Sequence, residues 1–87
     1  MSVSVDWREI SYNKTLEQEL LGLERRRASD PNCTIEDIEG ILYHLYILEG
    51  DDWLGRGEAQ DITMSATIAA YESFIARWKK ETEPEFL

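Results

Sequence analysis

Two pairs of acidic side chains come closest in this chain to the types and spacing of a catalytic site. Glu36 and Glu39 are three residues apart, and so are Glu49 and Asp52. Residues three apart on a helix are neighbours on its surface, so each pair would place two carboxylates side by side. Carboxylates are preferred ligands of Mg²⁺, and bound Mg²⁺ can assist the hydrolysis of phosphate esters. A magnesium-dependent phosphohydrolase is therefore one function to weigh.

The two pairs resemble, loosely, the Glu-x-x-Glu and Glu-x-x-Asp clusters of helical enzymes that hydrolyse nucleoside triphosphates. Glu39 and Glu49 are ten residues apart, about 15 Å along one helix, whereas magnesium ligands lie about 2 Å from the ion. The second glutamate of the double-glutamate start in those enzymes is replaced here by Gly40. Only an antiparallel helix of a second molecule could unite the pairs, so we expect no metal or cofactor site within one chain.

Few residues could serve in covalent catalysis, because the chain has one histidine and one cysteine. His44 shares a helical face with Asp37, but about 10 Å of helical rise separates them. Cys33 has no His or Lys nearby in the sequence to activate its thiol. One His and one Cys are also too few for a zinc site within one chain. We therefore expect a protein that is not an enzyme, with an inert, buried or half-buried thiol.

Charge narrows the classes of partner. Eighteen acidic residues against nine basic ones give a net charge of −9. This charge repels a phosphate backbone, so we expect no nucleic-acid binding. It promotes solubility, and it would also suit recognition of a basic protein. The chain is similar to acidic inhibitors and immunity-type proteins in length, charge and helicity only, and binding of a basic partner is our second hypothesis.

The cysteine count and the hydropathy of the sequence predict the cellular compartment of the protein. A lone cysteine forms no intramolecular disulfide, which favours a reducing, intracellular environment. The N-terminal residues lack the basic segment and apolar run of a secretory signal, and His44 interrupts the longest apolar stretch, Ile41 to Leu48. We therefore expect a cytoplasmic protein without a membrane-spanning segment.

Apolar periodicity predicts one all-α domain over residues 1–87, a small three-helix bundle. The first helix is clear from Asn13 to the arginines at 25–27, and the second runs from Ile35 to about Glu49. Thr34 and Asp37 form a capping box before the second helix, with Cys33 and Ile38 as a hydrophobic staple, and Gly50 is expected to end this helix in a left-handed conformation. The third helix is expected over residues 61–80.

The two ends of the chain are harder to assign. Val3, Val5 and Trp7 alternate as in a strand, whereas residues 6–9 resemble a capping box that opens a short extra helix. Trp7 and Ile10 do not continue the apolar stripe of the first helix, which predicts a bend or break near residues 11–14. Residues 1–12 are therefore treated as an arm. Pro84 predicts a mobile acidic tail over residues 82–87.

The third helix is the main evidence for assembly, because it has two apolar faces. The bulky face is expected to build the core with Leu16, Leu20 and the second helix; it comprises Met64, Ile68, Tyr71, Phe74, Ile75 and Trp78. The small-residue face is roughly opposite and comprises Ile62, Ala66, Ala69, Ser73 and Ala76. A helix with two buried faces lies between neighbours, so we expect dimerisation through this helix.

Two further surfaces are candidates for contact. On the second helix, Tyr43, Tyr46 and Ile47 lie beside Gly40, where either the rest of the chain or a partner covers them. In the loop over residues 50–58, Trp53 and Arg56 are the residue types that dominate binding energy at interfaces. Our leading hypothesis is a small non-enzymatic protein that acts by association, as a homodimer.

Overall fold

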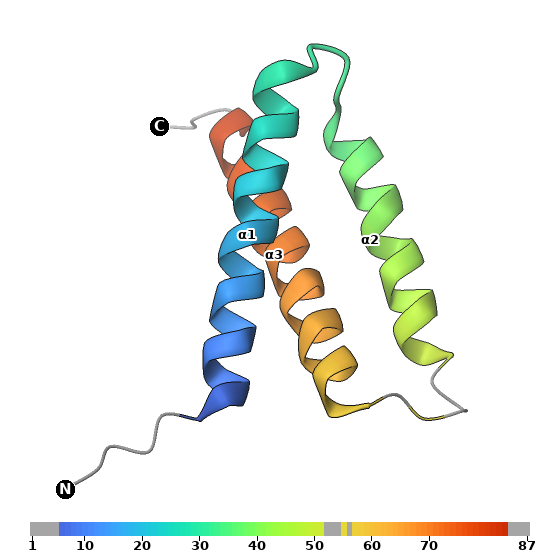
Figure 1. Ribbon diagram of the computed structural model, residues 1–87. Coiled ribbons are helices and arrows are strands. Elements are labelled where there is room, and N and C mark those ends of the chain that lie inside the picture. Colours follow the sequence, from blue (N-terminus) through green and yellow to red (C-terminus); the bar gives the residue numbers. More distant parts are fainter. Residues whose placement is uncertain (1–5, 52–54, 56, 84–87) are drawn as a thin grey trace, which may run out of the picture.

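The computed structural model describes residues 6–51, 55 and 57–83. It contains three helices, α1 (Trp7–Ser29), α2 (Ile35–Gly50) and α3 (Glu58–Thr82), which run up, down and up (Figure 1). The predicted all-α three-helix bundle is confirmed. α3 begins three residues earlier and ends two residues later than expected. None of the helices in the described part of the chain is both long and apolar enough to cross a lipid bilayer.

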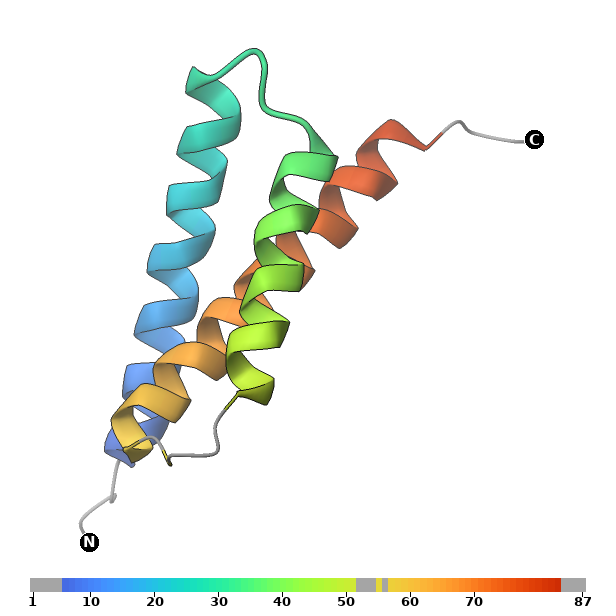
Figure 2. The ribbon, with the colours of Figure 1, turned by 90° about the vertical axis from the view of Figure 1, so that its right-hand side faces the viewer.

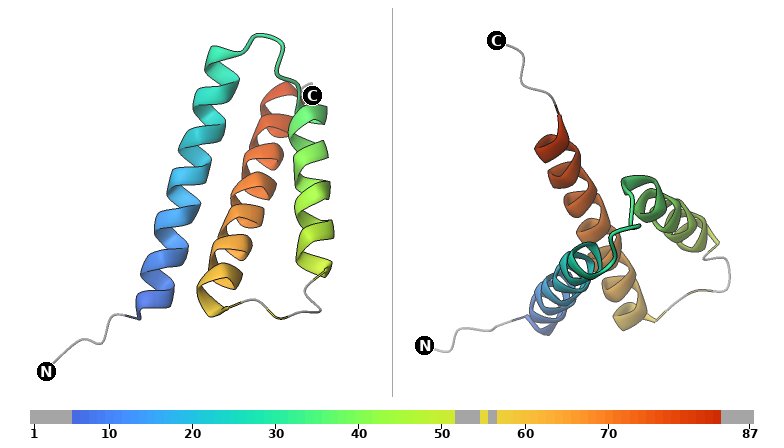
Figure 3. Two further views of the ribbon diagram at one scale, coloured as in Figure 1. Left: turned by 45° about the vertical axis from the view of Figure 1, so that its right-hand side comes forward. Right: turned by 90° about the horizontal axis from the view of Figure 1, so that it is seen from above.

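α3 lies between the other two helices. α1 packs along α3 in the same direction and α2 packs along it in the opposite direction, while the backbones of α1 and α2 do not approach each other closely (Figures 1 and 3). Figure 2 shows that α3 is inclined to both of its neighbours. Ion pairs join α1 to α3 at three levels, namely Arg8 with Glu58, Glu24 with Arg77 and Arg27 with Glu81. One chain therefore supplies both neighbours of α3.

α1 is one uninterrupted helix from Trp7, so the predicted break near residues 11–14 is wrong. Asp6 caps the helix, because its Oδ1 accepts a hydrogen bond from the backbone N–H of Arg8 at 3.0 Å. The helical interpretation therefore holds from residue 6, and residues 1–5 lie outside the described part. Trp7 and Ile10 leave the core stripe and are exposed. Main-chain bonding continues the helix even though these two side chains are not buried.

The start of α2 is confirmed in detail. Thr34 Oγ1 accepts a hydrogen bond from the Asp37 backbone N–H at 3.2 Å, and Asp37 Oδ2 accepts one from the Thr34 backbone N–H at 3.1 Å. Cys33 and Ile38, the two staple residues, are both buried in the core. All these contacts lie within six consecutive residues, so local sequence is enough to specify them.

The expected left-handed cap at Gly50 is wrong. Gly50 is the last residue of α2, and Asp51 follows with φ −88° while its N–H donates to the Ile47 carbonyl at 3.1 Å. Among the described glycines, φ is positive only at Gly55, where it is 79°. α2 therefore ends at Gly50 without a residue in the left-handed conformation.

The core is concentrated toward the α1–α2 connection. Its buried cluster is Leu23, Cys33, Ile38, Leu42, Ile68, Phe74 and Ile75. Met64, Tyr71 and Trp78 pack against this cluster, which confirms the predicted bulky face of α3. Leu20 packs there as well, whereas Leu16 is half-buried and is not part of the cluster. Burial is therefore strongest in the second half of α1 and the first half of α2.

At the other end of the bundle, residues 6–51, 55 and 57–83 form no buried core. α1 and α2 diverge toward this end (Figure 1). Among the described residues, none is buried before Leu23 in α1, between Leu42 and the end of α2, or before Ala66 in α3. Large apolar side chains are exposed along these stretches, namely Trp7, Ile10, Leu21, Tyr43, Tyr46, Ile47 and Leu48. We call this part of the bundle the open end.

Candidate association surfaces

The small-residue face of α3 is divided by the fold. Ala66 is 0% exposed, Ile62 and Ala69 are half-buried, and Ser73 and Ala76 are exposed. A partner could therefore contact only the edge of the predicted face.

α1 covers the buried side of that face. Ala66, Ala70 and Arg77 share one side of α3 by their helical spacing, and Arg77 Nη1 lies 3.1 Å from Glu24 Oε1 of α1. Ala70 is also 0% exposed, although the sequence pattern did not single it out. Small side chains let the two helices approach closely. Ala66 is thus an intramolecular contact and leaves no surface for a partner.

The outer strip of α2, which we define as Gly40, Tyr43 and Ile47, is open to solvent. Tyr43 is 59% exposed and Ile47 is 60% exposed. A Cβ placed on Gly40 would meet nothing within 4 Å. Their spacing of three and four residues places them on one face of α2, away from Ile38 and Leu42. The described part of the chain therefore leaves this strip uncovered.

Tyr46 differs from its two neighbours because α3 holds its hydroxyl. The Tyr46 O–H donates a hydrogen bond to Glu72 Oε2 at 2.5 Å. This bond stabilises the neutral phenol beside a carboxylate and raises the pKa of Tyr46 to about 12. The Tyr43 and Tyr46 rings lie with centroids 6.4 Å apart and planes tilted by 49°. The hydrogen bond to Glu72 therefore holds the Tyr46 side chain in place at the edge of the outer strip.

α2 and its surroundings carry a strongly negative charge. No Lys or Arg occurs between Ala28 and Gly55, whereas α2 carries Glu36, Asp37, Glu39 and Glu49. Lys79 of α3 reaches Glu39, with Nζ 2.8 Å from Oε2, and the hydrogen bond to Glu39 raises the pKa of Lys79. The outer strip of α2 is consequently apolar at its centre and acidic around it.

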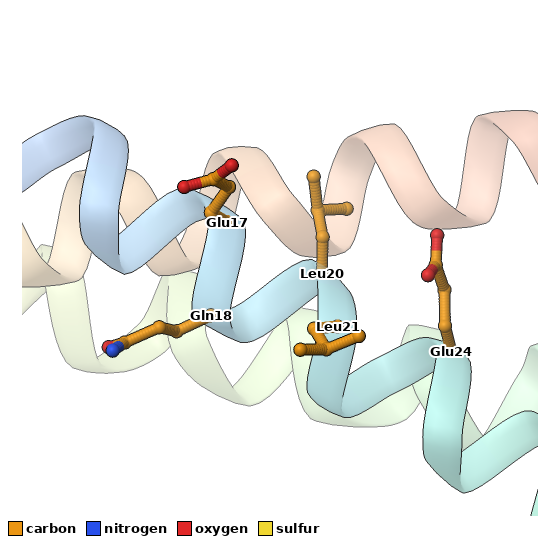
Figure 4. Close-up of a pocket in the computed structure, with 5 residues that line it drawn as sticks. All are labelled: Glu17, Gln18, Leu20, Leu21 and Glu24. Atoms are coloured by element: carbon orange, nitrogen blue, oxygen red, sulfur yellow. The ribbon is translucent and has the colours of Figure 1, made fainter.

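A leucine-lined hollow on α1 is a surface that the sequence analysis missed. Leu20 and Leu21 occupy its middle, with Glu17 and Gln18 toward one end and Glu24 toward the other (Figure 4). Leu20 packs against the core, while Leu21 is 46% exposed. Leu21 does not belong to the stripe of Leu16, Leu20 and Leu23 that marks the core side. An apolar side chain outside that stripe was the feature of the sequence that could have indicated this surface.

The candidate chemical groups do not gather into a site. Glu39 is paired with Lys79, and His44 is an exposed residue of α2. Within residues 6–51, 55 and 57–83, no three His, Cys, Asp or Glu side chains are placed to hold a metal ion. Asp52, Trp53 and Arg56, which complete the predicted acidic pair and the loop hot spot, lie outside the described residues.

Comparison with known proteins assigns no family. No protein-family model, no curated protein and no solved structure matches the chain. What the chain does must therefore be inferred from its own surfaces.

Proposed function

We propose that this chain is a small, non-enzymatic, cytoplasmic protein that acts by association with other protein chains and forms a homodimer. One observation carries the proposal. Seven large apolar side chains, on α1 and α2, are 38% to 60% exposed in a chain of 87 residues. One such side chain on a surface is ordinary, but exposed apolar side chains gathered on two helices are typical of surfaces that contact other proteins.

The open end supports this proposal. α1 and α2 leave each other uncovered there, so residues 6–51, 55 and 57–83 leave their outer apolar side chains exposed. Burial of a large aliphatic or aromatic side chain contributes about 1.5–3 kcal/mol, and a half-exposed one has about half of that still to gain. A second copy could cover several such side chains at once.

Sedimentation equilibrium over a range of micromolar concentrations tests the homodimer. We expect the mean mass to rise with concentration from 10.1 kDa toward twice that value. A mass of 10.1 kDa at every concentration would reject self-association.

A basic protein partner is a second candidate function, and the charge around the outer strip of α2 favours it. A cationic partner could pair with Glu36 while it covers Tyr43 and Ile47. Electrostatic attraction would make capture fast and strongly salt-dependent. We expect a basic protein to be retained at low salt, released at high salt and lost with Ile47→Asp, whereas Ala76→Asp on the exposed edge of α3 should retain it. Failure to recover any basic partner at low salt would count against this function.

A further inference from the structure

We infer that self-association uses an antiparallel pairing of α1 with α1 of a second copy, centred on Leu21. This inference rests on the proposed homodimer and names its contact surface. α1 packs against α3 alone among the described elements, so the side of α1 that faces away from α3 is open (Figure 3). Leu21, 46% exposed in the hollow of Figure 4, is the large apolar side chain at the middle of that open side.

The charges around Leu21 are self-complementary. Glu17 lies four residues before Leu21 and Arg25 lies four residues after it. At 100° per residue, both flank Leu21 on the same face of α1, at equal distances along the helix. A two-fold axis through the contact at Leu21 would bring Glu17 to the level of Arg25 of the second copy, and Arg25 to the level of the second copy's Glu17.

Both charged side chains are available for such a pairing. Glu17 and Arg25 are exposed, and neither side chain has an ion pair or hydrogen bond with another residue in the described part of the chain. Four other cations are already paired with acids of their own chain, namely Arg8, Arg27, Arg77 and Lys79. Arg25 is thus an unpaired cation beside the exposed leucine.

The charge pattern also selects the direction of pairing. A parallel pair of α1 helices in register would place each Glu17 beside another Glu17 and each Arg25 beside another Arg25. Like charges facing each other oppose association, and opposite charges fix register and orientation. The antiparallel pair satisfies all four side chains. Two Leu21 side chains meet at its centre.

The length over which the two α1 helices overlap limits the affinity of the dimer. With Leu21 at the centre, the two helices overlap from residue 13 to residue 29, a length of about 24 Å. One helix pair of this length buries less than the roughly 1,200 Å² of a standard stable interface. We therefore expect a dissociation constant in the micromolar range, which falls as salt is lowered.

Charge reversal tests the pairing directly. Glu17→Arg and Arg25→Glu should each weaken the dimer about tenfold or more in sedimentation equilibrium, because each creates two like-charge contacts per dimer. The double variant reverses both partners and should restore the dissociation constant to within about threefold of the wild type. Glu36→Arg on α2 and Lys80→Glu on α3 are matched controls that change the net charge equally and should leave the dimer unchanged.

The outcomes separate the pairing from the proposed function. A wild-type chain that stays monomeric would reject both the α1 pairing and the proposed homodimer. A wild-type dimer that responds to Glu17→Arg and Arg25→Glu no more than to the two controls, or that the double variant does not restore, overturns the α1 pairing and leaves the homodimer standing. Circular dichroism of every variant shows that the helices are intact.

Discussion

Leucine substitutions at Ala66 and Ala76 distinguish the two sides of the small-residue face of α3. Both alanines belong to the face predicted from the sequence, but Ala66 is 0% exposed and Ala76 is exposed. Ala66→Leu adds three carbon atoms at a fully buried position on the side of α3 that faces α1. Extra methylene groups in a packed core cost about 1–3 kcal/mol. Ala76→Leu points its added atoms toward solvent, so its effect should stay within about 0.5 kcal/mol.

The two variants are matched in chemistry. Alanine and leucine differ little in helix propensity, so a difference between the variants reports packing. Urea unfolding followed by far-UV circular dichroism measures the free energy of unfolding of each variant. Low protein concentration keeps self-association out of the measurement.

Thermal melts provide a second reading. For a domain of this size, 1 kcal/mol corresponds to a change in Tm of about 4–8 °C. We expect Ala66→Leu to lower the Tm by at least about 4 °C, and Ala76→Leu to change it by less than that. Equal stability of the two variants would contradict the position of α3 between α1 and α2.

Three further predictions concern single side chains. The pKa of Tyr46 is about 12 in the folded chain against about 10 in an unfolded one, so the contribution of its bond to Glu72 is complete below about pH 10 and is lost as the pH rises toward 12. Burial also raises the pKa of Tyr71, so tyrosinate absorbance should show a late step that Tyr46→Phe makes smaller. A wild-type titration complete near pH 10 with the fold intact, or a late step that Tyr46→Phe leaves unchanged, would disprove this prediction. Thr34→Ala should lower the free energy of unfolding by about 0.5–2 kcal/mol in urea unfolding, because it removes the cap of α2, whereas no loss would show that the cap is dispensable. Cys33 is buried, so a thiol reagent should modify it slowly in the folded chain and rapidly in urea, and equal rates would place it at the surface.

Local features of the fold were predictable from the sequence. Thr34, Asp37 and the staple at Cys33 and Ile38 specify the start of α2 within a few residues, and these contacts are present as expected. The bulky face of α3 was predictable as well, because large apolar side chains repeated with helical periodicity must be buried somewhere.

The periodicity of the sequence could not predict which helices pack against each other. The pattern of α3 shows that two sides are apolar, but the helix that covers Ala66 ends 37 residues earlier in the sequence, at Ser29, and the pattern does not identify it. The break expected near residues 11–14 failed for a related reason. It assumed that Trp7 and Ile10 must follow the core, whereas the fold leaves them exposed. Leu21 was overlooked because it lies off the core stripe, which is the property that makes it available to a second copy.

A mixture of two weakened variants is the most direct test of self-association through α1. Glu17→Arg changes the net charge from −9 to −7 and Arg25→Glu changes it from −9 to −11, so the two chains have no overall attraction for each other. In a mixed antiparallel pair, however, each position 17 faces an opposite charge at position 25. Sedimentation equilibrium should show each variant alone near 10.1 kDa and the equimolar mixture approaching twice that mass. A mixture that stays at 10.1 kDa, or variants that dimerise alone as well as the wild type does, would contradict the account.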